Sequence, residues 1–357
     1  MVNDKQQSNE MIITLETWEK IWCAQNSSYS KSKKNHKLKT WLILLRQKPV
    51  FIWIISIIQI IVFIGELGRN WALTGSPIEI KPSFNLGLGP SLFVLINMGA
   101  RFSPCMHSIP GITDNKFYYF SCPNYTGSIE QSSCTLNELC GFTYSTPPNQ
   151  WYRFMFPIFL HTGLIHIILN LLTQLIIGTR IERKNGTLRV VLIYFISGVF
   201  GIVLDTNFAP NGFVTVGCSG SLFGLVALYL LNILYDWHSS SSCYPLLNIM
   251  IDIVITFSLG FFPNISNFNH IGGFIMGLSL GVVLLAQPKR FRSIKWWIWS
   301  IIRCAYLLMI IVIYVVSFEN IYSRKFQCSW CKYLDCLPIR NWCDIGYLKK
   351  INTTMTS

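Results

Sequence analysis

Seven apolar runs, each about long enough to cross a bilayer, follow one another along this chain. Inside a bilayer the backbone finds no water, so such runs form helices that satisfy their own N–H and C=O groups. The runs cover roughly 50–66, 161–179, 188–204, 217–235, 244–262, 270–286 and 296–317. Because 51% of the residues are hydrophobic and only 13% are charged, the composition excludes a soluble domain. The sequence therefore predicts an all-α polytopic membrane protein.

The apolar runs divide the chain into one membrane domain with a polar segment at each end. Residues 1–48 form a basic head, residues 49–317 a membrane domain with a long loop at 67–150, and residues 318–357 a cysteine-rich tail. Residues 1–10 contain no apolar segment, so we expect no cleavable signal peptide and expect the first span to target the chain. The net charge of +13 comes from Lys and Arg residues that flank apolar runs, which argues against nucleic-acid binding.

The distribution of basic residues over the short loops predicts the orientation in the membrane. Basic residues gather after the second and sixth runs, as Arg180, Arg183, Lys184 and Arg189, and as Lys289, Arg290, Arg292 and Lys295. The loops 205–216 and 263–269 contain neither Lys nor Arg. Because basic loops stay on the cytosolic side, we expect a cytosolic N-terminus and a lumenal or extracellular long loop and tail. This orientation fits a multi-pass protein of the secretory pathway, in the Golgi, another endomembrane or the plasma membrane.

Two groups of cysteines lie in the segments that this orientation places outside the cytosol. They are Cys105, Cys122, Cys134 and Cys140 in the long loop, and Cys328, Cys331, Cys336 and Cys343 in the tail. Disulfides persist in oxidising compartments, so we expect these cysteines to be oxidised, with bridges that could link the loop to the tail. The spacing in the tail would also suit a zinc ion held by four thiolates, which is the less favoured reading.

A serine and a histidine occur at the starts of two different apolar runs. Ser219 follows Gly217 and Cys218, and His270 opens the sixth run. Glycine pairs at the same two runs, Gly220 and Gly224, and Gly273 and Gly277, would let the two helices approach closely. Histidine within hydrogen-bond reach of a serine can take its proton and return it to a leaving amine. The alternative is that the glycines serve only packing and that His270 is a hydrogen-bonded structural residue.

A second polar set lies at the start of the second apolar run. His166 and Asn170 are one helical turn apart and therefore share a face, and His161 precedes them. A neutral imidazole and a carboxamide can both donate hydrogen bonds to an oxyanion. Metal binding is the rival reading, but the spacing of the two histidines differs from that of zinc-binding helices, and that run contains no carboxylate. We therefore expect oxyanion donors, no metal and no cofactor.

The motifs occur in an order that resembles the rhomboid family of intramembrane serine proteases. They are Trp151-Tyr152-Arg153, His161-x4-His166-x3-Asn170, Gly178-x3-Glu182-x3-Gly186, Gly217-Cys218-Ser219-Gly220-Ser221-Leu222-Phe223-Gly224 and His270-x2-Gly273-x3-Gly277. The resemblance covers about residues 150–286. Asn97-Met98-Gly99-Ala100-Arg101 and the cysteine patterns of loop and tail resemble a eukaryotic, fungal-type secretory-pathway branch. That branch implies a six-helix core plus one C-terminal transmembrane helix.

The resemblance implies a role for each matching residue. Ser219 would be the nucleophile and His270 the general base, with His166, Asn170 and the Ser219 amide as the oxyanion hole. The supporting residues would be His161, Gly217, Gly220, Phe223, Gly273, Gly277, Arg153 and Glu182. Among these, His161 would hold structure or water, Phe223 would pack on the histidine ring, Arg153 would anchor the first loop, and Glu182 would cap the cytosolic turn.

Two residues depart from the pattern of the family, and neither removes a catalytic group. Cys218 stands where alanine is more usual, and Asn269 stands where a small apolar residue is more common. Asn269 could hydrogen-bond near the Ser219 and His270 side chains and change the basicity of the histidine. Such an enzyme would act on transmembrane segments of membrane proteins, within the lipid, near the lumenal or extracellular boundary.

Two other functions compete with proteolysis. A rhomboid-like protein could bind transmembrane helices without cleaving them, although the intact Ser219 and His270 argue against this. A transporter would need a chain of paired charges across the bilayer. Apart from Asp205 near a membrane edge and Asp252 within the fifth run, we find no such chain of charges, so transport is the weakest of the three readings.

Overall fold

The computed structural model describes most of the chain beyond the basic head. The described residues are 48–80, 85–110, 113, 118–122, 132–141, 148–236, 243–260, 265–287, 294–323, 325–326, 328, 330–335 and 349–350. The head at 1–47 and the cysteines Cys336 and Cys343 lie outside them. The chain divides into two units at residue 45, and all of the described residues belong to the second unit.

Among the described residues, seven apolar helical segments coincide with the seven predicted spans. They are α3 (Val50–Thr74), the continuous segment of α7 (Leu164–Thr173), η3 (Gln174–Gly178) and α8 (Thr179–Asn185), then α9 (Thr187–Phe208), α10 (Ser219–Tyr235), α11 (Cys243–Leu259), α12 (Asn267–Leu284) and α13 (Trp296–Ser323). Five of them are long and apolar enough to cross a bilayer, and the segments within α10 and α11 are shorter. The predicted class, an all-α polytopic membrane fold, is confirmed.

Helix α3 extends beyond the predicted end of the first span. The prediction ended at residue 66 because polar residues follow, but the helix continues to Thr74 and ends at Gly75 in the left-handed conformation. Glu66 and Asn70 are both fully buried. The Glu66 carboxylate accepts a hydrogen bond from His161 N at 3.1 Å, and Asn70 Oδ1 accepts one from Ser91 N at 3.0 Å. These hydrogen bonds attach α3 to the long loop and to the start of the second span. The helix can therefore extend past Glu66 although polar residues follow.

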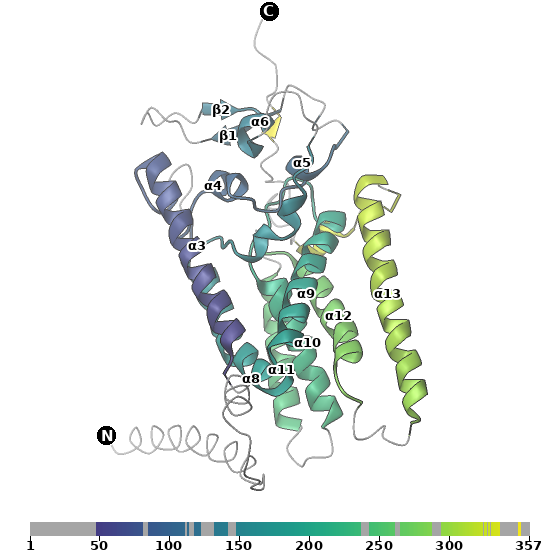
Figure 1. Ribbon diagram of the computed structural model, residues 1–357. Coiled ribbons are helices and arrows are strands. Elements are labelled where there is room, and N and C mark those ends of the chain that lie inside the picture. The colour runs from purple at the N-terminus through teal and green to yellow at the C-terminus, as the bar shows by residue number, and fades with distance from the viewer. Residues whose placement is uncertain are drawn as a thin grey trace, which may run out of the picture. The chain divides into compact units, whose positions relative to one another are not determined.

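Helix α12 lies in the interior of the bundle, and α13 lies at its edge. Helix α12 packs most extensively against α9 and α10, and 61% of its apolar window is buried, against 6% for α13. Figure 1 shows α3 and α13 at opposite edges of the bundle, with α9, α10 and α12 between them. Large hydrophobic side chains of α13 are thus left to face lipid, whereas the inner helices pack on one another.

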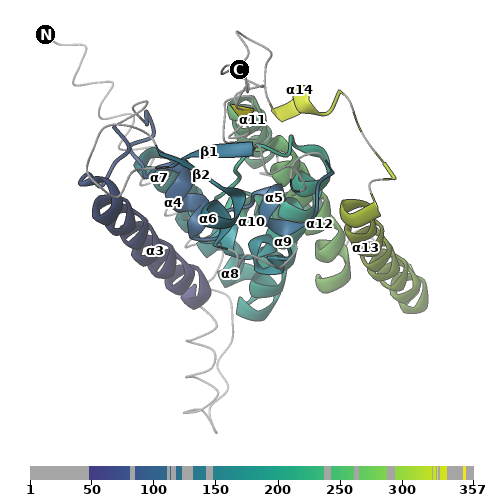
Figure 2. The ribbon, with the colours of Figure 1, turned by 90° about the horizontal axis from the view of Figure 1, so that it is seen from above.

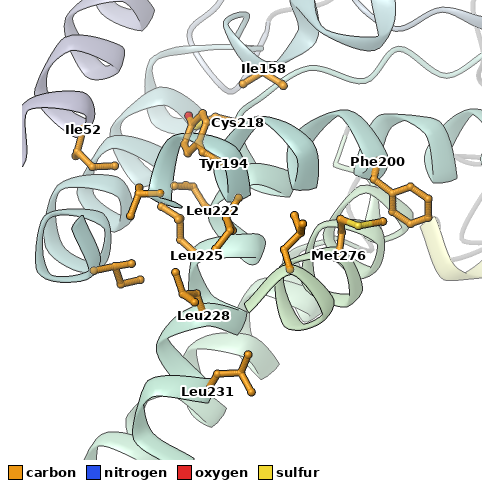
Figure 3. Close-up of a cluster of buried hydrophobic side chains, with 14 of the residues drawn as sticks. Ile52, Ile158, Tyr194, Phe200, Cys218, Leu222, Leu225, Leu228, Leu231 and Met276 are labelled. Carbon is orange, nitrogen blue, oxygen red and sulfur yellow. The ribbon is translucent and has the colours of Figure 1, made fainter. Parts of the chain in front are cut away.

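A hydrophobic cluster between α9, α10 and α12 supports the start of α10. Figure 3 shows Leu222, Leu225 and Leu228 in one row along α10, with Met276 nearby and with Cys218 beside Tyr194. Every one of these side chains is at most 5% exposed. Packing of this density fixes the helix that begins at Ser219, because any shift would open voids.

Three spans are also joined by a buried network of polar side chains that sequence patterns did not indicate. Gln59 on α3 donates to the Tyr194 hydroxyl of α9 at 2.9 Å, and Gln174 of η3 donates to Gln59 Oε1 at 2.9 Å. The Tyr194 hydroxyl in turn donates to Gln174 Oε1 at 2.8 Å. Hydrogen bonds between helices hold a bundle together where lipid removes the hydrophobic driving force.

The long loop folds onto one end of the bundle as short helices. They are α4 (Leu92–Asn97), α5 (Ser103–Met106) and α6 (Leu136–Cys140). Two 3₁₀ helices, η1 (Trp151–Phe154) and η2 (Phe156–Ile158), follow the loop and precede the second span. Val94, Leu95 and Ile96 of α4 are fully buried in a cluster with other loop residues. The apolar character of 92–97 is therefore explained by packing within the loop and against the end of the bundle, where Leu160, Val214 and Val216 join the same cluster.

Short strands, which were not predicted, connect the loop to the tail. Strand β1 (Tyr118–Cys122) pairs antiparallel with β2 (Ser132–Cys134) and with β3 (Lys349–Lys350), in the order β2-β1-β3. The register places Tyr118 opposite Lys350. Figure 1 shows β1 and β2 beside α6, at the end of the bundle that carries the long loop.

One disulfide of the described residues closes within the loop, and another closes within the tail. Cys105 is bonded to Cys140, and Cys328 is bonded to Cys331. Cys134 is disulfide-bonded as well. Neither the Cys105–Cys140 bond nor the Cys328–Cys331 bond links the loop to the tail. Among the described residues, the β1–β3 pairing connects these two segments. The bond between Cys328 and Cys331 favours the disulfide reading of these two tail cysteines over zinc ligation.

Candidate active site

Ser219 is the first residue of α10, and the backbone that leads to it, residues 214–218, is tightly constrained. Gly217 has a backbone φ of 116°, a value that residues with a side chain rarely adopt. Its N–H donates to the Pro157 carbonyl at 2.8 Å. Residues 214–218 are buried, whereas Ser219 is partly exposed. The first N–H groups of a helix lack partners inside that helix and carry its positive end. The hydroxyl of Ser219 is thus accessible at a place suited to a developing negative charge.

His270 lies within hydrogen-bond distance of Ser219. Its Nε2 is 3.0 Å from Ser219 Oγ, and it is the fourth residue of α12, whereas Ser219 is the first of α10. His270 is 1% exposed. The two side chains that the sequence singled out on separate spans are therefore in direct contact.

Glycines bring the two helices close enough for this contact. A Cβ atom on Gly273 would lie 2.7 Å from the carbonyl carbon of Gly220, and one on Gly277 would lie 2.8 Å from the carbonyl carbon of Gly224. Both distances are shorter than real Cβ contacts. The backbones of α10 and α12 consequently meet along the two glycine pairs that the sequence indicated.

Aromatic rings hold the imidazole of His270. The Phe223 ring stacks on it with a centroid distance of 4.5 Å and an interplanar angle of 16°. Phe257 of α11 meets the same imidazole edge to face at 6.1 Å and also contacts Phe223 at 5.2 Å. The two phenyl rings restrict rotation of His270 about its side-chain bonds, and they keep Nε2 directed toward Ser219.

Asn269 also reaches the serine. Its Nδ2 donates to Ser219 Oγ at 3.4 Å, a longer and weaker contact than that of His270. Asn269 is 2% exposed, and a Cβ atom on Gly220 would lie 3.0 Å from its Cγ. The asparagine fills the space above Gly220, which explains why a larger residue than usual fits at this position.

His166 and Asn170 lie beside the approach to Ser219. A Cβ atom on Gly217 would be 3.0 Å from His166 Nε2 and 3.4 Å from Asn170 Nδ2. Among the described residues, the buried Asn170 Nδ2 has no hydrogen-bond partner. These two nitrogen atoms are therefore directed to the backbone that carries Ser219, and one of them is a donor that nothing else uses.

Thr162 holds the ring of His166 in place. Its hydroxyl is 3.0 Å from His166 Nδ1, and its carbonyl accepts from Asn85 Nδ2 at 3.1 Å. When the hydroxyl donates to Nδ1, the single proton of the neutral imidazole resides on Nε2, the atom nearest Gly217. The Thr162 contact thus prepares His166 to donate toward Ser219.

The loop before the second span supports the start of α7. Leu164 N donates to the Leu88 carbonyl at 3.2 Å, and Ile165 N donates to the Gly87 carbonyl at 3.3 Å. The backbones are so close that a Cβ atom on Gly163 would lie 2.6 Å from the carbonyl carbon of Gly87. The long loop therefore satisfies the first N–H groups of the helix that carries His166 and Asn170.

His161 is placed behind the site. It is fully buried, and its Nε2 is 3.9 Å from Cys218 Sγ. Its ring meets that of His166 edge to face at 5.4 Å, and its N–H is held by Glu66. His161 thus packs between the site and α3, without touching Ser219.

Arg153 and Glu182 lie away from Ser219 and bind backbone. Arg153 Nη1 donates to the carbonyls of Ile96 and Ala100 at 2.6 and 2.8 Å, which fastens the long loop. The carboxylate of Glu182 accepts from Phe51 N and Ile52 N, both at 2.9 Å. Glu182 therefore caps the start of α3, and this interaction joins the first span to the end of the second.

Several residues that complete the site were missed by the sequence analysis. Thr162, Asn85 and Glu66 act through contacts with residues that lie far away in sequence or in an irregular turn, so no periodic pattern marks them. Phe257 was missed because α11 reads as an unbroken apolar run. The polar residue Glu66 inside an apolar segment was the one signal that could have been used.

The arrangement can perform proton transfer and bind an oxyanion. Ser219 and His270 have the chemistry and the contact that a nucleophile and a base need, and His166, Asn170 and the start of α10 offer hydrogen-bond donors. No cluster of three or more metal-ligating side chains occurs among the residues that the structure describes. The donor set is that of acyl transfer.

Comparison with known proteins gives an independent assignment. The rhomboid domain matches residues 148–287. Rhomboid-type serine protease 2 of Emericella nidulans is 37% identical, with 83% of this chain and 71% of that protein covered. RHOMBOID-like protein 4 of Arabidopsis thaliana is 33% identical, with 59% of this chain and 58% of that protein covered. Inactive rhomboid protein 1 of Danio rerio is 28% identical, over 57% of this chain and 24% of that protein.

The matched stretch contains each of the helices that meet at Ser219 and His270. The similarity to the fungal relative covers 83% of the chain and so extends beyond that stretch. The predicted rhomboid-type membrane fold is confirmed by the same match. This chain belongs to the rhomboid family.

Proposed function

We propose that this protein is an intramembrane serine endopeptidase that cleaves transmembrane segments of other membrane proteins. The observation that carries this proposal is the 3.0 Å contact between Ser219 Oγ and His270 Nε2. Family membership alone does not decide the activity, because a relative named as inactive also matches this chain. The geometry of the two side chains is what separates a protease from a protein that only binds helices.

The proposed reaction begins with transfer of the Ser219 proton to His270 Nε2 as Oγ attacks the substrate carbonyl carbon. The negative charge that forms on the carbonyl oxygen is stabilised by His166, Asn170 and the Ser219 N–H. Each such donor contributes roughly 2.7–4 kcal/mol to transition-state stabilisation. The C–N bond then breaks, and His270 returns the proton to the leaving amine. Water, activated by the same histidine, releases the acyl group from Ser219.

This mechanism uses two catalytic side chains. Among the described residues no side chain hydrogen-bonds to His270 Nδ1, so an acidic third member is not part of the proposal. Stacking on Phe223 provides the orientation that a carboxylate provides in a triad. Asn269 donates to Ser219 Oγ, a contact that does not oppose loss of the serine proton, because the oxygen remains the acceptor.

We further propose a cytosolic N-terminus, a lumenal or extracellular loop and tail, and a place in the secretory pathway. Two disulfides, Cys105–Cys140 and Cys328–Cys331, support this orientation because such bonds persist in oxidising compartments. Ser219 begins α10 on the side of the long loop, so cleavage would occur near the lumenal boundary. The boundaries of the head (1–48), the membrane domain (49–317) and the tail (318–357) are part of this proposal.

A fluorophosphonate probe tests the proposal directly, because it reacts with an activated serine and needs no known substrate. We expect labelling of the purified protein in detergent and loss of labelling in Ser219→Ala and His270→Ala. Ser221→Ala is the matched control, since Ser221 is a buried serine two residues away and should leave labelling unchanged.

Cleavage is then measured by co-expressing the protein with a panel of single-span membrane proteins. At least one substrate should be cut by the wild type and by Ser221→Ala, and none by Ser219→Ala. Binding of single-span proteins with no labelling and no cleavage would instead identify a non-proteolytic binder of transmembrane helices.

A further inference from the structure

The tail of the protein returns to the helix that carries His270. Helix α14 (Lys332–Asp335) follows α13 and contacts the start of α12. Asp335 Oδ1 accepts from Asn267 N at 2.8 Å and from Phe268 N at 3.3 Å. Asn267 Nδ2 in turn donates to the Leu334 carbonyl at 2.7 Å. Asp335 is 2% exposed, so solvent is largely excluded from this contact.

The contact satisfies backbone groups that a helix leaves open. The first N–H groups of α12 have no partner within the helix. Ser266 accepts from Asn269 N at 3.2 Å, and Asp335 takes the N–H groups of Asn267 and Phe268 before it. His270 comes next in the chain. A residue of the tail therefore holds the turn that begins three residues before the proposed base.

The same carboxylate belongs to a buried charged network. Ser266 Oγ lies 2.5 Å from Asp205 Oδ1 and 3.4 Å from Asp335 Oδ2. Asp205 forms an ion pair with Arg101 of the long loop, with 3.0 Å between Nε and Oδ2 and both side chains fully buried. The end of α9, the long loop, the start of α12 and the tail are joined at this point.

We infer that Asp335 is a positioning residue for His270: the tail docks on the start of α12 and fixes the direction in which the imidazole meets Ser219. This inference rests on the proposed function, since it assigns His270 the role of base. It adds the cysteine-rich tail to the parts of the chain that the reaction needs. The Cys328–Cys331 disulfide lies shortly before Asp335 and constrains the part of the tail that leads to this carboxylate.

The docked tail should respond to pH. Burial, and secondarily the negative charge of Asp205, raise the pKa of Asp335 from 3.8 to about 7, which Arg101 and the two backbone donors only partly offset. Asp205 and Arg101 are the charged groups that face this carboxyl from the elements packed against it. A raised pKa in the docked state means that docking takes up a proton. Docking is therefore strongest below about pH 4, weakens as the pH rises to about 7, and changes no further above that value.

The test uses the full-length protein in detergent and two substitutions of Asp335. Asp335→Ala removes both backbone contacts, and we expect fluorophosphonate labelling of Ser219 to slow about tenfold at pH 6, in the range produced by loss of a helix N-cap. Asp335→Asn keeps an acceptor oxygen of the same shape and lacks the titrating proton, so it should label at a rate close to wild type at pH 6. Glu319→Gln is the control, because it neutralises an exposed carboxylate on the neighbouring α13.

The pH profile separates positioning from a general effect on folding. The ratio of wild-type to Asp335→Asn labelling rates should fall between pH 5 and 7 and then level off, because only the wild type loses docking there. Hydrogen exchange of the Asn267 and Phe268 amides, compared between the two proteins at each pH, should show the same trend. Because both proteins contain His270, its titration affects both labelling rates, and taking their ratio at each pH removes this shared effect.

The outcomes distinguish this inference from the proposed function. A wild type that the probe does not label would contradict the proposed function, while exchange at Asn267 and Phe268 would still report whether the tail docks. Labelling of Asp335→Ala at the wild-type rate, with unchanged exchange and pH profile, would overturn the inference and leave the proposed function intact. If Asp335→Ala does not fold, the comparison with Asp335→Asn decides alone, and a ratio independent of pH would overturn the inference.

Discussion

Gly273 of α12 lies against the Gly220 carbonyl group of α10, so that a Cβ atom on Gly273 would be 2.7 Å from the carbonyl carbon. Both residues belong to the first two turns of helices whose starts carry Ser219 and His270. The separation of the two helix backbones therefore sets the distance between the serine and the histidine. No side chain fits between them.

The glycine contact predicts that added side chains will disable the site at a distance. Gly273→Val and Gly277→Val should push α12 away from α10, lower thermal stability by an amount on the order of 1–3 kcal/mol, and abolish labelling of Ser219. Gly68→Val is the control, because a Cβ atom there meets nothing within 4 Å. Normal labelling and melting of both α12 variants would show that the helices do not need this approach.

Ser219 and His270 should act as one unit. Ser219→Ala and His270→Ala should each abolish cleavage of a transmembrane substrate, and the double variant should be no worse than either single one. The comparison requires equal expression, measured by immunoblot of membrane fractions. Clear turnover by one single variant would refute the assignment of that residue.

Asn170 should stabilise the transition state and contribute little to substrate binding. Asn170→Ala is expected to lower kcat by roughly 10²–10³ with a smaller change in KM. Asn232→Ala provides the control, since Asn232 is also a buried asparagine without an amide partner among the described residues but lies near the other end of α10. Inhibition of the wild type by a chelator, reversed by zinc, would instead support a metal at this position.

Thr162 should influence the rate through the ring of His166. Thr162→Val keeps the shape of the side chain and removes the hydroxyl 3.0 Å from Nδ1. Loss of one such hydrogen bond, about 0.5–1.5 kcal/mol, should lower kcat about threefold to tenfold and leave KM almost unchanged. Thr179→Val, which removes an exposed hydroxyl bonded only to its own helix, should have no effect. Equal kcat values for the two variants would exclude this role.

The oxidation state of the cysteines can be counted. Thiol labelling of the denatured, unreduced protein should modify four cysteines, which are Cys23, Cys218, Cys243 and Cys304. The structure has Cys218 and Cys304 free and Cys105, Cys140, Cys328 and Cys331 bonded. Mass spectrometry before and after reduction gives the number. Labelling of all twelve cysteines without reduction would contradict the disulfides.

The sequence predicted the parts of the site that short motifs carry. Ser219 and His270 could be found because each is a polar residue next to glycines at the start of an apolar run, and the structure brings these two residues together. The seven spans could be found because lipid permits only long apolar helices. The ends of the spans do not follow from hydropathy alone. In α3 the apolar pattern stops at Glu66, whereas the helix continues to Thr74.

The remaining contacts depend on tertiary structure. Asp335 and Asn267 are 68 residues apart in sequence. Strands β1 and β3 pair although most of the membrane domain lies between them in sequence. Neither partner carries a local signal, because an aspartate in a tail or two adjacent lysines are typical of an exposed surface. Which cysteines pair could not be predicted, because cysteine spacing does not determine connectivity. The structure pairs Cys105 with Cys140 and Cys328 with Cys331.

Two of the helices that carry the proposed catalytic groups have first turns that are hydrogen-bonded by residues outside the part of the chain that matches the rhomboid domain. The start of α7 rests on the carbonyls of Gly87 and Leu88, and the start of α12 rests on Asp335. All three residues lie beyond 148–287, the part that matches the rhomboid domain. A chain trimmed to that stretch would keep every residue of the proposed chemistry and lose the anchors of two of its three helices. We therefore expect the smallest version that keeps the proposed activity to include both the long loop and the beginning of the tail.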